Sequence, residues 1–113
     1  MTSPITTHVL DTAAGRPAAG IDVRLSNRDA SGAWREIGSG TTDGDGRVGD
    51  LLADRLESGE YRLRFETGTY FDRLGVAAFY PHVEIAFSVA DPTQHYHVPI
   101  LLNPFGYSTY RGS

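Results

Sequence analysis

The amino-acid sequence predicts an all-β fold, a sandwich or barrel built from seven or eight short strands. Two observations favour this class. Apolar and polar residues mostly alternate with a period of two, which is the pattern of strands that bury one face. Turn-forming Gly, Pro, Asn and Asp residues recur about every ten residues, a spacing typical of sandwiches and barrels.

The first half of the chain predicts three strands and the turns between them. Ile21, Val23 and Leu25 alternate with polar residues, so this strand has one wet face. Tight turns are expected where Gly and Asp cluster, because Gly adopts a positive φ at little cost. In order, the expected elements are a strand at Ile5–Asp11, a turn-rich stretch over 12–20, a strand over 21–26, a hairpin turn over 29–32, a return strand over 34–42 and a tight turn over 43–46.

The second half predicts four further strands and one short helix. Residues 51–56 fit a loop or a helical turn equally well, and the sequence leaves both open. The helix is expected over 69–74 because Gly75 follows as a natural C-terminal stop. Asn103-Pro104 should end a strand. The expected strands are 61–66, 83–89, 94–102 and, at the C-terminus, 105–111.

Length and composition restrict the class of protein. The chain has 113 residues, which predicts a single domain over 1–113. Its net charge of −4 and the lack of a basic stripe argue against a nucleic-acid partner. The first residues show neither a signal peptide nor a membrane span, and no cysteine is present. We therefore expect a cytoplasmic protein without a membrane partner, whose many edge strands favour oligomers.

Histidines are the main candidates for chemistry. His95 and His97 are two residues apart on an expected strand and so share a face, whereas Tyr96 should point to the core. Such a pair suits acid–base chemistry, a zinc site with a third ligand from elsewhere, or two solvated strand histidines. His8 lies on another strand, and Arg47 follows the tight turn as a surface charge. No spacing rule links these residues to one another.

Several other kinds of site are excluded. The chain has no cysteine nucleophile, no Gly-x-Ser-x-Gly elbow and no phosphate-binding loop. The Asp43–Gly46 turn loosely resembles a calcium loop, but aligning Gly46 with the loop glycine puts Leu52 at the closing Glu position. The C-terminal run from Tyr107 is unusually rich in aromatic, basic and hydroxyl residues for a tail. Its ordinary interpretation is an edge strand.

Five segments together resemble one family, the 5-hydroxyisourate hydrolases of the transthyretin-related group. They are Thr7–Thr12, Gly15–Gly20, Tyr80–Val83, His95–Leu102 and Tyr107–Ser113, and they occur in the family's order over almost the whole chain. Transthyretin itself, a hormone carrier, shares the fold but lacks the terminal signature and the catalytic histidines and arginine. The resemblance therefore favours the enzyme over the carrier.

The resemblance implies a fold, an activity and a site. It implies a transthyretin-like sandwich of two sheets with one short helix, which hydrolyses 5-hydroxyisourate to 2-oxo-4-hydroxy-4-carboxy-5-ureidoimidazoline in urate degradation. A histidine would assist water as it attacks a cyclic amide. By resemblance, the catalytic residues are His8, Arg47 and His97. His8 and Arg47 would also bind substrate together with Tyr110 and Ser113, and no cofactor or metal is expected.

The resemblance also implies an assembly, a homotetramer made as a dimer of dimers. Its active sites would lie in the channel between dimers, each completed by more than one subunit. Two alternatives remain at this point. One is a non-enzymatic, transthyretin-like carrier that binds aromatic ligands in the channel. The other is a zinc hydrolase that uses His8, His95 and His97.

Overall fold

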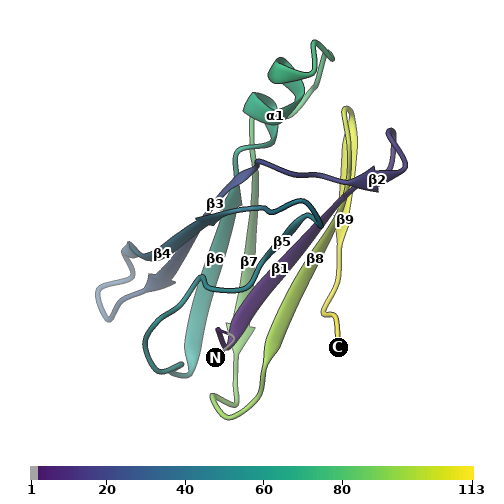
Figure 1. Ribbon diagram of the computed structural model, residues 1–113. Helices are drawn as coiled ribbons and strands as arrows, with labels where there is room; N and C mark the ends of the chain where they lie inside the picture. The colour runs from purple at the N-terminus through teal and green to yellow at the C-terminus, as the bar shows by residue number, and fades with distance from the viewer. Residues whose placement is uncertain (1–2) are drawn as a thin grey trace.

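The structure, a computed structural model, describes residues 3–113, whose strands form two sheets packed face to face (Figure 1). Sheet A has the strand order β2-β1-β8-β9, and β5 also pairs with β1. Its strands are β1 (Ile5–Asp11), β2 (Arg16–Pro17), β5 (Arg47–Val48), β8 (Tyr96–Asn103) and β9 (Gly106–Thr109). Sheet B has the order β4-β3-β6-β7. Its strands are β3 (Asp22–Arg28), β4 (Trp34–Thr41), β6 (Gly59–Phe65) and β7 (Val83–Val89).

This architecture confirms the expected all-β sandwich with one short helix. Within the described residues seven strands have four or more residues, and β2 and β5 have two each. These two short strands were not expected, because two residues are too few to show a period. Residues 51–56 form a loop in which Leu51, Leu52 and Leu56 are buried. The last strand is shorter than expected, since β9 ends at Thr109 and the chain beyond it makes only an isolated bridge at Gly112.

Most strand pairs are antiparallel, but β1 and β8 are parallel over seven residue pairs. This pairing brings Thr6 opposite His97 and joins segments from the two ends of the described chain. On its other side β1 pairs with β5, where His8 lies opposite Arg47. β1 is therefore the central strand of sheet A, with neighbours on both sides.

The core lies between the two sheets. Alternate residues of the longer strands point into it, as the period of two requires. In β1 the inward residues are Ile5, Thr7, Val9 and Asp11, of which Ile5 and Val9 have no exposed surface. The largest fully buried side chains are Ile5, Ile21, Leu25, Leu51, Leu63, Phe65, Ile100 and Leu102.

The helix α1 (Thr67–Arg73) lies at one end of the sandwich (Figure 1). It begins two residues before the expected start. Gly75, whose φ is +68°, follows its C-terminal end. Tyr70 anchors the helix to sheet A, because its hydroxyl donates a 2.7 Å hydrogen bond to the buried Asp11 carboxylate. Burial, followed by this hydrogen bond, raises the pKa of Tyr70 to about 12. Asp11 also accepts backbone N–H bonds from Ala13 and Ala14.

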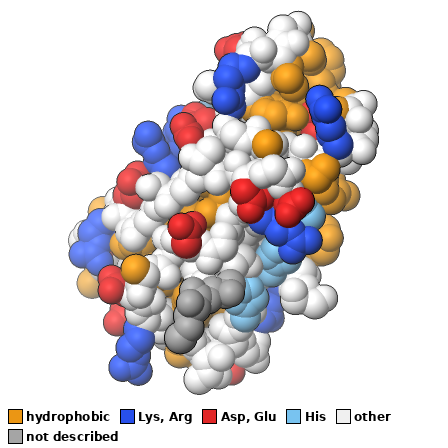
Figure 2. All heavy atoms as spheres, viewed as in Figure 1, with side chains coloured by type: hydrophobic (Ala, Val, Ile, Leu, Met, Phe, Trp, Pro, Cys, Tyr) orange, Lys and Arg blue, Asp and Glu red, His pale blue; other side chains and the backbone are white. Residues whose placement is uncertain are grey.

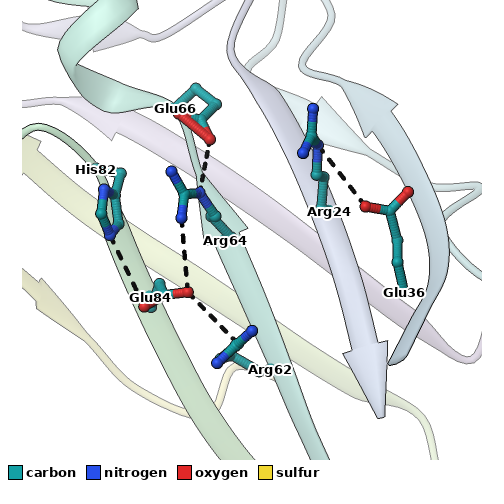
Figure 3. Close-up of polar contacts among 7 residues, drawn as sticks. All are labelled: Arg24, Glu36, Arg62, Arg64, Glu66, His82 and Glu84. Atoms are coloured by element: carbon teal, nitrogen blue, oxygen red, sulfur yellow. Dashed lines mark hydrogen bonds and ion pairs between the residues drawn. The ribbon is translucent and has the colours of Figure 1, made fainter. Parts of the chain in front are cut away.

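The outer face of sheet B carries paired charges (Figure 3). Glu84 is the centre of one cluster: it lies 3.5 Å from Arg62, 4.0 Å from Arg64 and 3.8 Å from His82. Arg64 also donates a 2.7 Å hydrogen bond to Glu66. Such partly exposed pairs contribute little to stability, about 0–1 kcal/mol each. Because the charges largely cancel, this face offers no concentrated charge to a ligand.

Among residues 3–113, no helix has the length and apolar character needed to span a membrane. The only helix found there is α1, of seven residues.

The Asp11–Tyr70 contact predicts the effect of Tyr70→Phe. The change leaves one oxygen of a buried carboxylate without its donor, which costs about 1–3 kcal/mol of unfolding free energy. Urea unfolding at a fixed protein concentration measures this loss. Tyr80→Phe is the matched control, because within residues 3–113 the Tyr80 hydroxyl makes no hydrogen bond. A Tyr70→Phe protein as stable as wild type would contradict the anchoring role.

Candidate functional site

The outer face of sheet A gathers side chains that can transfer protons. Figure 2 shows histidine side chains close to basic and acidic ones on one part of the surface. Thr6 and His8 point outward from β1, because Thr7 between them points into the core. His95 and His97 share this outer face, as their spacing predicts, while Tyr96 is buried beneath them. The parallel register of β1 and β8 brings the two sets together.

A shallow hollow of about 260 Å³ lies on this face. It lies where β1, β5, the start of β8 and the end of the chain meet. The residues that line it include Thr6, Arg47, Val48, His95, His97 and Ser113. Three of the predicted site residues, Arg47, His97 and Ser113, therefore share one hollow. We call it the histidine hollow.

His8 lies next to the hollow, opposite Arg47 in strand register. Its Nε2 atom is 2.8 Å from the carbonyl oxygen of Asp45. A carbonyl only accepts, so Nε2 carries the proton of the neutral ring and Nδ1 keeps its lone pair. The tight turn thus fixes the tautomer of His8.

The geometry of that turn explains its sequence. Gly46 has a φ of +75°, and a Cβ there would lie 2.4 Å from the carbonyl oxygen of Val9. Asp43 accepts hydrogen bonds from the backbone N–H groups of Asp45 and Arg47. These bonds lower the pKa of Asp43, the one from Arg47 most of all. The turn holds the Asp45 carbonyl near His8 and starts the strand that carries Arg47.

Thr6 contacts both His97 of β8 and His95, which directly precedes that strand. Its Oγ1 lies 2.8 Å from Nδ1 of His97 and 2.9 Å from Nε2 of His95. Thr6 is only 8% exposed, so water does not compete freely for its hydroxyl. The other ring nitrogen of His97, Nε2, makes no hydrogen bond to any residue of 3–113.

The surroundings of His97 keep it neutral. Burial lowers the pKa of His97 below its ordinary 6.5, and the positive charges of His8, His95 and Arg47 lower it further. At neutral pH the ring therefore has an available lone pair, which a general base requires.

The C-terminal segment packs directly on His97. The Gly112 N–H donates a 2.8 Å hydrogen bond to the carbonyl oxygen of His97. A Cβ on Gly112 would lie 2.6 Å from Cδ2 of the His97 ring, closer than real contacts allow. The guanidinium of Arg111 stacks 4.4 Å from the ring centre of Tyr96 and donates to Gln94. These contacts bring Ser113 to the hollow.

Tyr110 does not line the histidine hollow. It lines a second, mainly apolar hollow of about 300 Å³, together with Phe87 of β7 and with His97 and Val98 of β8. Its side chain is 56% exposed. One subunit thus brings Arg47, His97 and Ser113 together, with His8 alongside, and leaves Tyr110 outside the histidine hollow.

No group of three His, Cys, Asp or Glu side chains within the described residues is arranged to hold a metal ion. One ring nitrogen of each histidine contacts Thr6, namely Nε2 of His95 and Nδ1 of His97. His8 is directed to the Asp45 carbonyl. The zinc alternative is thus not supported by the donor geometry.

Two features of this site were missed in the sequence. The linking role of Thr6 depends on a partner 91 residues away, and no local pattern reports such a contact. The close approach of Gly112 to His97 was missed for the same reason. The period of two in β1 predicts that Thr6 points outward, but it does not identify the residue that Thr6 contacts.

Comparison with known proteins places this geometry in a family. The family model described as HIUase/Transthyretin matches residues 5–112. A 5-hydroxyisourate hydrolase from Mus musculus is 47% identical, over 98% of this chain and 96% of its own length. A probable 5-hydroxyisourate hydrolase from Schizosaccharomyces pombe is 48% identical, over 96% of this chain and 90% of its own length.

Solved structures of both kinds resemble the fold. Sea bream transthyretin, in complex with thyroxine, has a TM-score of 0.91 and 32% identity, covering 97% of this chain and 95% of its own. The 5-hydroxyisourate hydrolase of Klebsiella pneumoniae has a TM-score of 0.85 and 37% identity, covering 96% of this chain and 98% of its own. This chain thus shares its backbone shape with both a transthyretin and a hydrolase. The chain belongs to the HIUase/Transthyretin family.

Proposed function

We propose that this protein is an enzyme that hydrolyses 5-hydroxyisourate to 2-oxo-4-hydroxy-4-carboxy-5-ureidoimidazoline in urate degradation. The observation that carries the proposal is the histidine hollow, where Arg47 and a neutral His97 lie together beside His8. The curated relatives named 5-hydroxyisourate hydrolase, 40–48% identical to this chain, support it. So does a plant relative named as a uric acid degradation bifunctional protein.

The reaction opens a cyclic amide and makes three demands on a site. A water molecule must lose a proton as it attacks, the carbonyl oxygen must be stabilised as it gains charge, and the leaving nitrogen must receive a proton. A positioned acid or base contributes about 10²- to 10⁴-fold to such a step. Because the ring amide is already activated by its neighbouring carbonyl groups, these demands need no metal or cofactor.

The residues of the hollow match these demands. His97, whose pKa is lowered, and His8 supply the base and the acid. Arg47 offers a fork of N–H donors to the anionic heterocycle or to the developing oxyanion. Ser113 binds and orients the substrate from the end of the chain.

We propose a homotetramer, a dimer of dimers, as the working assembly. The hollow is open on one side, as expected of a site completed by another subunit, and Tyr110 is 56% exposed in the single chain. In the tetramer, Tyr110 of one subunit would reach the site of a neighbouring subunit. The whole of 1–113 is proposed to act as a single domain.

A non-enzymatic carrier of aromatic ligands is the second candidate, since a transthyretin has a TM-score of 0.91 with this chain. Binding alone does not need a neutral histidine beside an arginine, and both are present here. The hydrolase relatives are also more similar in sequence than that transthyretin, at 47–48% against 32% identity. These observations favour the hydrolase.

We also propose a cytoplasmic location. The sequence contains no cysteine, which is typical of proteins from reducing compartments. Fractionation of the source cells tests this proposal.

The activity is tested by generating 5-hydroxyisourate from urate with urate oxidase and following its absorbance. The protein should speed its disappearance. His8→Asn, Arg47→Gln and His97→Asn should each lower kcat/KM by about 10²-fold or more, because each removes an acid–base or oxyanion group. The tetramer mass, measured by sedimentation, should be unchanged. Wild-type rates in all three variants would show that the chemistry lies elsewhere.

The lowered pKa of His97 predicts the pH dependence. A protonated imidazole cannot act as a base, so kcat/KM should fall toward acid with a midpoint below 6.5. Arg47→Gln removes a neighbouring positive charge, so the pKa of His97 should move up. Imidazole NMR signals followed against pH measure this shift without the need for activity. A midpoint at or above 6.5 in the wild type would contradict the assignment.

The contact of Gly112 with His97 predicts the effect of Gly112→Ala. The added Cβ would meet the His97 ring, so the C-terminal segment must move away and carry Ser113 out of the hollow. We expect kcat/KM to fall by about tenfold or more, as for other displaced site groups. Deleting Tyr110–Ser113 should abolish hydrolysis and leave the fold, monitored by circular dichroism, intact.

Gly44→Ala is the matched control for Gly112→Ala. A Cβ at Gly44 meets no atom within 4 Å, and the position is exposed. This variant should keep wild-type activity. Full activity of the protein without 110–113 would show that the segment has no part in the site.

A further inference from the structure

The Thr6 hydroxyl links two imidazole rings on the outer face of sheet A. It lies 2.8 Å from Nδ1 of His97 and 2.9 Å from Nε2 of His95. A hydroxyl has one proton to donate and two lone pairs with which to accept. When it donates to one neutral ring, it must therefore accept from the other if both contacts are to be hydrogen bonds.

This constraint couples the protonation of the two rings. If Thr6 donates to His95, then Nδ1 of His97 carries a proton and Nε2 of His97 keeps its lone pair. If Thr6 donates to His97, then Nε2 of a neutral His97 carries the proton instead. The direction of one O–H bond thus decides whether His97 offers a base or an acid at its Nε2 atom.

The two histidines differ in their exposure to solvent. His97 is half-buried and faces the charges of His8, His95 and Arg47, which disfavour its protonated form. His95 is exposed to solvent, and its Nε2 atom contacts the Thr6 hydroxyl. A proton that leaves His97 through Thr6 therefore reaches a ring that water can contact.

The scaffold holds this link in place. Thr6 lies opposite His97 in the parallel register of β1 and β8. The pairing of these strands therefore fixes the position of the hydroxyl relative to His97. Its β-branched side chain has few rotamers, which limits the directions of Oγ1. The 8% exposure of Thr6 keeps solvent from replacing the contacts.

We propose that Thr6 and His95 form a proton relay behind His97. The proposal rests on the hydrolase function proposed above. Within it, His97 is the group that contacts the attacking water, Thr6 is a positioning and relay residue, and His95 holds the charge while the water adds.

The forward step balances as follows. Nε2 of neutral His97 takes a proton from the water, whose oxygen forms a bond to the amide carbon. Nδ1 of His97 passes its proton to Oγ1 of Thr6, and Thr6 passes its own proton to Nε2 of His95. His97 and Thr6 end neutral, His95 ends as an imidazolium, and the oxyanion carries the matching negative charge.

The reverse step resets the site. As the amide C–N bond breaks, Nε2 of His97 gives its proton to the leaving nitrogen. Nδ1 of His97 recovers a proton from Thr6, and Thr6 recovers one from His95. The relay narrows the acid–base roles proposed above: His97 is base in the first half and acid in the second, and His8 is left to bind the substrate. No net proton is consumed within the relay.

Two variants test the relay. Thr6→Val keeps the shape of the side chain and removes the hydroxyl, so kcat should fall by about 10²-fold while KM changes by less than about threefold. Thr6→Ser restores the hydroxyl and should keep most of the activity. His95→Gln can still bond to Thr6 but cannot take a proton, so kcat should fall and added imidazole at constant pH should restore it.

Matched controls come from the other sheet. Thr41→Val removes the hydroxyl of a threonine that donates to Asp22, and His82→Gln removes a histidine that lies 3.8 Å from Glu84. Both should keep wild-type kcat, and neither should respond to imidazole. Circular dichroism and the thermal midpoint check that each variant is folded.

The outcomes separate the two proposals. If the wild-type protein does not speed the decay of 5-hydroxyisourate, the proposed function fails. If the wild type is active and Thr6→Val or His95→Gln keeps its kcat, only the relay fails. A His95→Gln protein that is slow but is not restored by imidazole also overturns the relay, because His95 would then act only through packing.

Discussion

The parallel pairing of β1 with β8 is the constraint on which the rest of the site depends. It brings Thr6 opposite His97, and it makes β1 a central strand whose other edge receives β5 and Arg47. A shift of one residue in this register would turn the outward side chains of β1 into the core and destroy both site and packing. The buried residues of β1, such as Ile5 and Val9, therefore hold the functional face in place.

The two outer faces of the sandwich differ in how their charges are paired. On sheet B, each Arg of the Glu84 cluster lies near a carboxylate, so charge is largely cancelled. On sheet A, Arg47 and the histidines form no ion pair with a carboxylate within the described residues. Their positive charges instead lower the pKa of His97. The proposed chemistry uses that uncompensated face, while the backbone beneath it resembles that of a transthyretin.

Much of the fold could be predicted from the sequence, because strand periodicity and turn residues are local signals. The Ile5–Asp11 strand and the Asp43–Gly46 turn lie where the pattern puts them. The two-residue strand that carries Arg47 was not predicted, since it exists only because β1 lies beside it. The site residues came from resemblance, whereas the link through Thr6 needed the sheet order, which no local pattern contains.

The separation of 91 residues between Thr6 and His97 has a consequence for biosynthesis. As the chain leaves the ribosome, β1 emerges first and remains without its parallel partner until β8 has been made. Such non-local pairing is slow to form and leaves a strand edge open to other chains in the meantime. The strands of sheet B are joined by shorter connections than the one between β1 and β8. Sheet B can therefore fold earlier and provide a surface against which β1 packs. The face that carries the proposed site is thus the last part of the molecule to be completed, so on this proposal a nascent chain gains hydrolytic activity only once nearly all of it has been translated.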